Sequence, residues 1–177
     1  MKIYGVLILG AGASSLMCAS HLDKKLSVGI VDINGKIAVK LKISGGSKCN
    51  VTNVEVSEAN YDGDSEFISS VFDAFSKEDL LNYLRANGVE PVVRKDRYYF
   101  CKDSSDEIIN IFKRATKQVD MLLDRDILEV KKDDILFEVK TSKGILRAKN
   151  VVVATGGKSY KELGASDIGL VIAKSFG

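Results

Sequence analysis

The stretch IYGVLILGAGASS, residues 3–15, decides the fold class of this chain of 177 residues. Its first part, residues 3–9, is a nearly continuous apolar run, which is typical of a parallel strand buried on both faces. Gly10 and Gly12 follow at once, and small residues lead from them into a helical pattern that reaches Leu22. The order strand, glycine turn, helix predicts the start of an α/β domain with a parallel sheet.

The same turn predicts a dinucleotide site. Gly10 would make the tight turn, and Gly12 would let a pyrophosphate approach the backbone. The first residues of the helix offer free N–H groups and a partial positive charge of about half a unit. Asp32 ends the next predicted strand, where its carboxylate can accept hydrogen bonds from both ribose hydroxyls. A simple strand–helix turn is the alternative. The candidate residues of this motif are Gly10, Gly12, Ala13, Ser14, Ser15 and Asp32.

The rest of the chain alternates between helical and strand patterns. Ser76 with Asp79 three residues later predicts a helix start, and Gly88 a helix end. After residue 125, apolar and polar residues alternate along the chain. This pattern predicts a small antiparallel meander that is followed by a separate buried strand. We expect helices over 65–75, 77–86, 104–119 and 167–176, and strands over 26–31, 90–94, 97–101, 126–131, 135–141, 145–148 and 150–154.

A second glycine turn, VVVATGG over residues 151–157, closes the last predicted strand. Glycines at the carboxyl end of a buried strand let a ligand lie close to the backbone. A glycine turn placed after a meander is the arrangement of FAD-binding flavoproteins more than of simple NAD dehydrogenases. Together the patterns predict a Rossmann-like FAD-binding parallel sheet with an antiparallel β-meander, and candidate residues Thr155, Gly156 and Gly157.

The polar stretch ISGGSKCNVTN, residues 43–53, predicts a loop that wraps an anionic ligand. Its glycines free the backbone, its serines and asparagine offer hydrogen bonds, and nearby lysines can neutralise phosphate charge. A surface loop with solvated lysines is the alternative. The candidate residues are Lys40, Ser44, Gly45, Gly46, Lys48, Cys49 and Asn50.

Cys49 raises the question of a redox role. A thiol beside cationic groups gains thiolate character, and near a flavin it could relay electrons. The sequence shows no second cysteine close to it, because Cys18 and Cys101 lie far away along the chain. We therefore favour a structural cysteine at this position.

Composition narrows the function classes. The net charge of +2 gives no reason to expect nucleic acid or an anionic membrane as partner. The cysteines form no C-x-x-C pair, so we expect no metal site and a reducing cytoplasmic location. The apolar start is too short and too rich in glycine and serine to span a bilayer.

Two motifs carry a family resemblance. KLKISGGSKCNVTN, residues 40–53, and VVVATGGKSYKELGASDIGLVIAKSFG, residues 151–177, resemble signatures of the BaiN/RdsA-type family of NAD(P)/FAD-dependent oxidoreductases, also called aminoacetone-oxidase-like flavoproteins. The resemblance spans essentially the whole chain. Ser47 and Lys48 stand where the family has glycine and arginine, and Lys161 stands where it usually has proline.

The resemblance implies an FAD-dependent enzyme that passes hydride between NAD(P)H and an unidentified small-molecule acceptor. Family members are about twice as long, so residues 1–177 are expected to form the FAD/NAD(P)-binding domain without the family's inserted second domain and C-terminal return segment. The alternatives are a dinucleotide-binding module without turnover and a plain NAD-binding Rossmann enzyme. The sequence identifies no catalytic residue and leaves the oligomeric state open.

Overall fold

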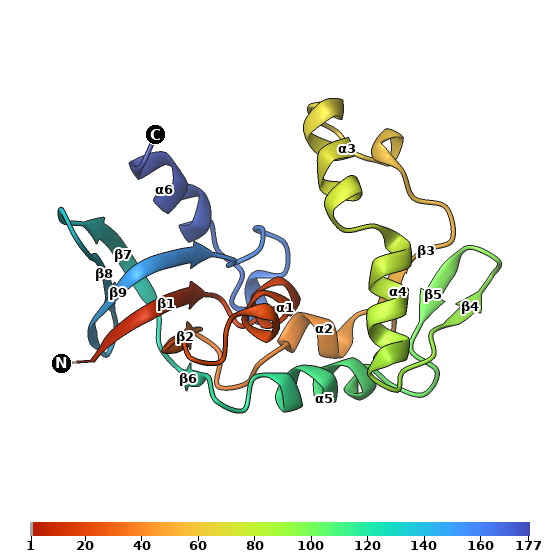
Figure 1. The fold of residues 1–177 in the computed structure, drawn as a ribbon, viewed down its shortest axis with the longest axis horizontal. Helices are drawn as coiled ribbons and strands as arrows, with labels where there is room; N and C mark the ends of the chain where they lie inside the picture. Colours follow the sequence, from red (N-terminus) through yellow and green to blue (C-terminus); the bar gives the residue numbers. More distant parts are fainter. Residues whose placement is uncertain (1) are drawn as a thin grey trace. The chain divides into compact units, whose positions relative to one another are not determined.

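A computed structural model describes residues 2–177 of the chain, which form two compact units. The first unit comprises Met1–Lys40 and Phe112–Gly177, and the second comprises Leu41–Ile111. Figure 1 shows the elements of both units in sequence colours.

The first unit is built on a six-stranded sheet with the strand order β6-β2-β1-β9-β8-β7. Its central strand β1 pairs in parallel with β2 on one side and with β9 on the other, and β2 pairs in parallel with β6. The parallel half therefore has the right order for a Rossmann-like sheet, as the sequence predicted. The strands are β1 (Ile3–Leu9), β2 (Val28–Val31), β6 (Asp120–Leu122) and β9 (Gly144–Val153).

The antiparallel half of this sheet is the predicted meander. β7 (Ile127–Lys132) pairs with β8 (Phe137–Thr141), and β8 pairs with the first half of β9. Our prediction of two separate strands over 145–148 and 150–154 is wrong, because β9 is continuous. A single strand takes both roles because its first half pairs with β8 on one side, while most of its length pairs with β1 on the other side.

Apolar side chains from both halves of the sheet form the core of the first unit. Leu7, Ile8 and Leu9 of β1 are fully buried, as expected for a strand covered on both faces. Leu7 and Leu9 pack with residues of the meander and with Ile172 of α6 (Ile168–Ser175). Helix α1 (Ala13–His21) follows the first glycine turn and buries one side, including Leu16.

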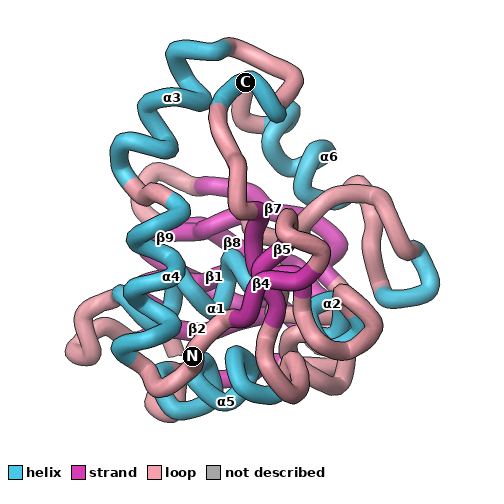
Figure 2. Tube along the Cα trace, turned by 90° about the vertical axis from the view of Figure 1, so that its right-hand side faces the viewer, coloured by secondary structure: helices cyan, strands magenta, loops and turns pink. Residues whose placement is uncertain are grey.

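The second unit has a small antiparallel sheet in the order β3-β5-β4. Figures 1 and 2 show β4 and β5 as a hairpin, whose turn residues Lys95 and Asp96 both have positive φ. Leu81 and Leu84 lie on the buried side of α4, which begins with the predicted capping box of Ser76. The elements are β3 (Asn50–Asn53), α3 (Ser65–Ala74), α4 (Lys77–Ala86), β4 (Val92–Arg94) and β5 (Tyr98–Phe100).

Along the sequence, the two boundaries between the units fall within helices α2 (Val39–Ile43) and α5 (Asp106–Ala115). The remaining elements are the short 3₁₀ helices η1 (Glu58–Asn60) and η2 (Lys161–Leu163). Within residues 2–177, every helix falls short of the length and apolar character that crossing a lipid bilayer requires.

Candidate nucleotide-binding site

A cavity of about 250 Å³ lies at the carboxyl ends of the parallel strands of the first unit. Gly10 follows β1, Asp32 follows β2 and Thr155 follows β9, so three predicted site residues meet in it. Ligands of open α/β sheets bind in this position, outside the carboxyl ends of the strands. Residues that line the cavity are Gly10, Asp32, Ile33, Asp126, Ile127, Thr155, Lys161, Gly164, Ala165, Ser166 and Ile168.

Gly10 brings the two glycine turns into contact. Its φ of 100° lies in the region that favours glycine, and a Cβ at this position would be 2.5 Å from the backbone oxygen of Ala154. The chain after β1 therefore passes directly against the chain after β9. This close approach requires glycine at position 10.

Gly12 differs from Gly10, because a Cβ at position 12 would meet nothing within 4 Å. It occupies the N-cap position of α1 with φ −81° and ψ −174°, which other residues can adopt. No side chain of residues 2–177 caps this helix, and its first turn contains no acidic residue. The backbone N–H groups at the start of α1 thus remain available for an anion that approaches over Gly12.

Ser15 stands in place of the third glycine of the motif and is fully buried. Its Oγ donates a hydrogen bond to the backbone oxygen of Ala154 at 3.2 Å. A serine fits here because it is small and its hydroxyl finds an acceptor at the end of β9. The substitution therefore preserves the close packing of α1 against the sheet.

The carboxylate of Asp32 joins the glycine turn to the end of β2. Its Oδ2 accepts a hydrogen bond from the backbone N–H of Ala11 at 2.6 Å, and its Oδ1 accepts from the backbone and side-chain nitrogens of Asn34 at 2.7 and 2.9 Å. Asp32 thus orders the first glycine turn at Ala11 and the turn after β2 at Asn34. Its predicted contact with ribose hydroxyls stays a prediction.

The second glycine turn leaves room next to the backbone. A Cβ on Gly156 or Gly157 would meet nothing within 4 Å, and Gly156 has a φ of 74°. Thr155 is packed more closely, because a Cβ on Gly169 of α6 would lie 2.3 Å from its Oγ1. The backbone of Gly156 and Gly157 is therefore open, and the predicted contact of this turn with a ligand stays a prediction.

Sequence reasoning missed Lys161, which lies in η2 and lines the cavity. Lys161 stands where the family usually has proline, and a lysine four residues after Gly157 is also a signal for a cation that could meet a phosphate. The predicted cation Lys40 lies in α2 and is partly buried. Neither lysine forms an ion pair within 4 Å with any acidic side chain of residues 2–177.

The predicted ligand-wrapping loop lies in the second unit. Ile43 ends α2 and Asn50 begins β3, so the loop is shorter than we predicted. Residues 45–47 have φ values of 56°, 66° and 67°. A Cβ on Gly45 would lie 2.5 Å from the ring of Phe100 and 2.9 Å from the backbone nitrogen of Asn50. The loop therefore follows a tight left-handed path that needs glycine.

Ser47→Gly is expected to stabilise the protein by about 1 kcal/mol, because a non-glycine residue pays that cost at positive φ. The Ser47 φ of 67° is the reason, and the resembling family has glycine at this position. Urea unfolding measures the effect. Ser65→Gly, at the first residue of α3, is the control and is expected to destabilise slightly. Equal loss of stability in both variants would contradict the assignment of strain.

Our expectation that Cys49 has no cysteine near it is wrong. Cys49 and Cys101 are both buried, and their thiols interact directly. The hydrogen bond from the Cys101 thiol lowers the pKa of Cys49 against the opposing effect of burial, and the Ser44 hydroxyl also lowers it. The same hydrogen bond and burial raise the pKa of Cys101. The pairing was hidden because the two residues are 52 positions apart and meet only through the register of β3 and β5.

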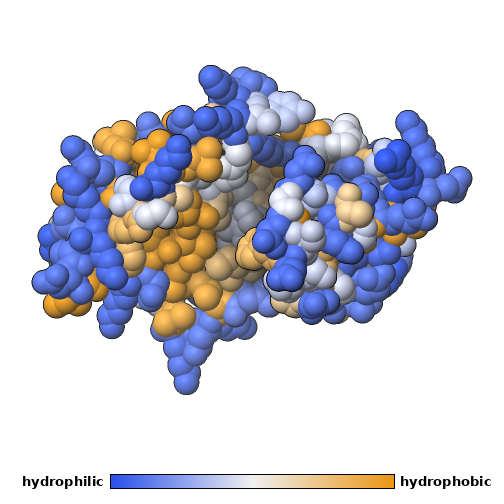
Figure 3. Space-filling model, turned by 90° about the horizontal axis from the view of Figure 1, so that it is seen from above, coloured by the Kyte–Doolittle hydropathy of each residue, from blue (hydrophilic) through white to orange (hydrophobic). Residues whose placement is uncertain are grey.

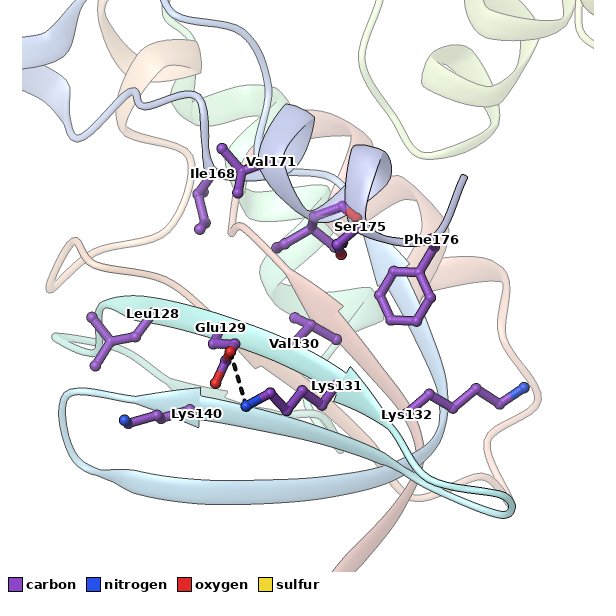
Figure 4. Close-up of a pocket in the computed structure, with 11 residues that line it drawn as sticks. Leu128, Glu129, Val130, Lys131, Lys132, Lys140, Ile168, Val171, Ser175 and Phe176 are labelled. Atoms are coloured by element: carbon purple, nitrogen blue, oxygen red, sulfur yellow. Dashed lines mark hydrogen bonds and ion pairs between the residues drawn. The ribbon is translucent and has the colours of Figure 1, made fainter.

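A second and larger cavity of about 730 Å³ lies between α6 and the meander. Figure 4 shows Val171 and Phe176 on the helix side and an ion pair between Glu129 and Lys131 on β7, at 3.0 Å. Apolar side chains gather on the side of the molecule that carries α6 (Figure 3). None of the predicted site residues lines this cavity.

The parallel sheet, the glycine turn and the cavity at the strand ends define a Rossmann domain. The chain belongs to the HI0933-like family, because residues 4–177 match the model of the HI0933-like protein Rossmann domain. This membership confirms the family resemblance drawn from the motifs.

Named relatives cover nearly the whole chain. The ribosomal RNA dihydrouridine synthase of Haemophilus influenzae is 31% identical over 97% of this chain, and that of Escherichia coli is 29% identical over 100%. The 3-dehydro-bile acid delta(4,6)-reductase of Clostridium scindens is 25% identical over 96% of the chain. The chain spans 43–45% of the length of these relatives.

Solved structures agree with the fold. A flavocytochrome c3 fumarate reductase superimposes with a TM-score of 0.66 at 18% identity, covering 99% of this chain and 41% of that one. Glycine oxidase from Bacillus cereus superimposes with a TM-score of 0.57 at 18% identity, covering 98% of this chain and 58% of that one. At this level of identity the likeness concerns the fold.

Proposed function

We propose that the chain carries the FAD-binding part of an FAD-dependent oxidoreductase. The observation that carries the proposal is the cavity in which Gly10, Asp32 and Thr155 meet beside the uncapped start of α1. An anionic dinucleotide needs free N–H groups, open backbone and a carboxylate for its ribose, and all of them are present in the first unit.

Each group of residues has a defined part in holding the cofactor. The N–H groups of residues 13–15 would bind the pyrophosphate, which would pass over Gly12 because no side chain blocks it there. Asp32 would bind the adenosine ribose, and Gly156 and Gly157 would face the middle of the cofactor. For the loop residues Lys40, Ser44, Gly45, Gly46, Lys48, Cys49 and Asn50, a part in holding a cofactor stays the prediction made from the sequence.

The flavin, when bound, supplies the hydride chemistry, and the protein positions and shields it. We propose NAD(P)H as the hydride donor. The names of two relatives describe the formation of dihydrouridine and the reduction of a Δ4,6 bile acid, and both reactions add hydrogen across a carbon–carbon double bond. We therefore propose an acceptor with a conjugated double bond. The net charge of +2 favours a small molecule over RNA.

FAD-loaded protein is expected to lose its visible flavin absorbance when it is mixed with NADPH or NADH without oxygen. The reduction should be much faster than that of free FAD at the same concentration, because the protein holds donor and acceptor together. Free FAD with each nicotinamide is the control. If bound and free FAD are reduced at the same rate by both donors, the chain is better described as a dinucleotide-binding module without turnover.

A further inference from the structure

The positions of Cys49 and Cys101 match those of cross-strand disulfide partners. Asn50 faces Phe100 where β3 and β5 pair antiparallel, so residues 49 and 101 face each other one position further on. The backbone N–H of Cys101 donates to the oxygen of Cys49 at 3.4 Å. Facing residues of an antiparallel pair have Cα atoms about 4.5–5.5 Å apart, within the range of disulfides, and Cys49 stands at the end of this ladder with a φ of 49°.

The surroundings of the two thiols favour a reaction between them. Both are free thiols with exposed fractions of 1% and 0%, so a disulfide reagent must reach Cys49 through a local opening of the chain, whereas the second step joins two neighbouring side chains. The two thiols lie close enough for each to shift the pKa of the other, and the Cys49 Sγ also lies 3.8 Å from the backbone oxygen of Asn50. The lowered pKa of Cys49 and the raised pKa of Cys101 assign the thiolate to Cys49 and the proton to Cys101. A thiolate is the form that attacks a disulfide.

We propose that Cys49 and Cys101 form a reversible redox pair that a low-molecular-weight disulfide such as oxidised glutathione converts into an intramolecular disulfide. The Cys49 thiolate attacks the glutathione disulfide, forms a mixed disulfide and releases one glutathione thiolate. Cys101 then loses its proton and attacks the sulfur of Cys49, and the second glutathione leaves as a thiolate. The pair is oxidised by two electrons and one glutathione disulfide is reduced to two glutathione molecules.

The bond would fix the exit of the left-handed loop. The backbone N–H of Cys101 also donates to the backbone oxygen of Lys48 at 2.9 Å, and that of Ser105 donates to the backbone oxygen of Ser47 at 2.8 Å. The loop before β3 and the chain after β5 are therefore already hydrogen-bonded to each other. A covalent link would hold the path of residues 45–49 and reduce the freedom of the unfolded chain. Regulation of flavin binding through this loop would rest on the proposed function, whereas the disulfide itself does not.

The test uses the native chain without flavin. The protein is equilibrated with oxidised glutathione, quenched with acid, alkylated under denaturing conditions and mapped by peptide mass spectrometry. The expected result is a peptide that links Cys49 to Cys101, with Cys18 alkylated. The melting temperature should rise on oxidation and return to its starting value with reductant.

Two variants make the result specific. Cys18→Ser is expected to behave as the native chain does, whereas Cys101→Ser should form no intramolecular bond and show no rise in melting temperature. Recovery of Cys49 and Cys101 as alkylated thiols, or a bond from either of them to Cys18, would overturn the proposal. Because no flavin is present, such a result would leave the proposed cofactor site untouched.

Discussion

Gly12→Val is expected to weaken FAD binding by roughly 100-fold, or about 2.7 kcal/mol, while lowering the stability of the fold by no more than about 1 kcal/mol, because valine is a poorer N-cap residue than glycine. The two effects separate because the space beside Gly12 is empty of protein atoms, while its backbone φ of −81° suits any residue. A valine side chain would fill the path by which the pyrophosphate reaches the N–H groups of α1. Isothermal titration with FAD and thermal unfolding measure the two quantities on the same sample.

Gly63→Val provides a control for a glycine-to-valine change outside the predicted cofactor residues. Gly63 lies in a turn of the second unit and has a φ of 146°, so this variant is expected to lose some stability and to keep its FAD affinity. If Gly12→Val binds FAD as tightly as the native chain does, the pyrophosphate does not pass over the first glycine turn.

Gly10→Ala is expected to lower the free energy of unfolding by about 3 kcal/mol, from backbone strain together with a steric clash. The added Cβ would lie 2.5 Å from the oxygen of Ala154 in a region of φ that alanine rarely adopts. Relief of the clash would require the ends of β1 and β9 to move apart. These two strands form the centre of the sheet, so the loss should appear in the global unfolding transition.

Urea unfolding measures this loss, and Gly12→Ala is the matched control. The same substitution two residues later meets no atom within 4 Å, so it should change stability by less than about 1 kcal/mol, because the lower entropy of the unfolded chain offsets the poorer N-cap. Equal stability of the Gly10→Ala and Gly12→Ala proteins would contradict the close approach of the two glycine turns.

Local patterns predicted the elements whose signals lie within a few residues. The apolar run of β1 and the capping box of α4 gave bounds that match the structure, Ile3–Leu9 and Lys77–Ala86. Burial on both faces of a strand and the satisfaction of helix N–H groups are both visible in the sequence itself. The positions of the two glycine turns were predictable for the same reason.

The missed elements depend on partners that are distant in the sequence. β3 is polar, Asn50–Asn53, and forms a strand because β5 pairs with it. β6, Asp120–Leu122, is short and lies between the predicted helix over 104–119 and the predicted strand from 126, where we predicted no element; in the structure it forms an edge strand beside β2. Lys161 lines the cavity through a turn that the sequence did not indicate.

Backbone amide NMR of the isotope-labelled chain, titrated with FAD, tests the central claim most directly. The account predicts that the largest shift changes fall on the first glycine turn and the start of α1, residues 10–15, with further changes at Asp32 and at residues 155–157. Of these residues, Gly10, Asp32 and Thr155 line the cavity at the strand ends. Changes confined to the groove between α6 and the meander, or no changes at saturating FAD, would contradict the account.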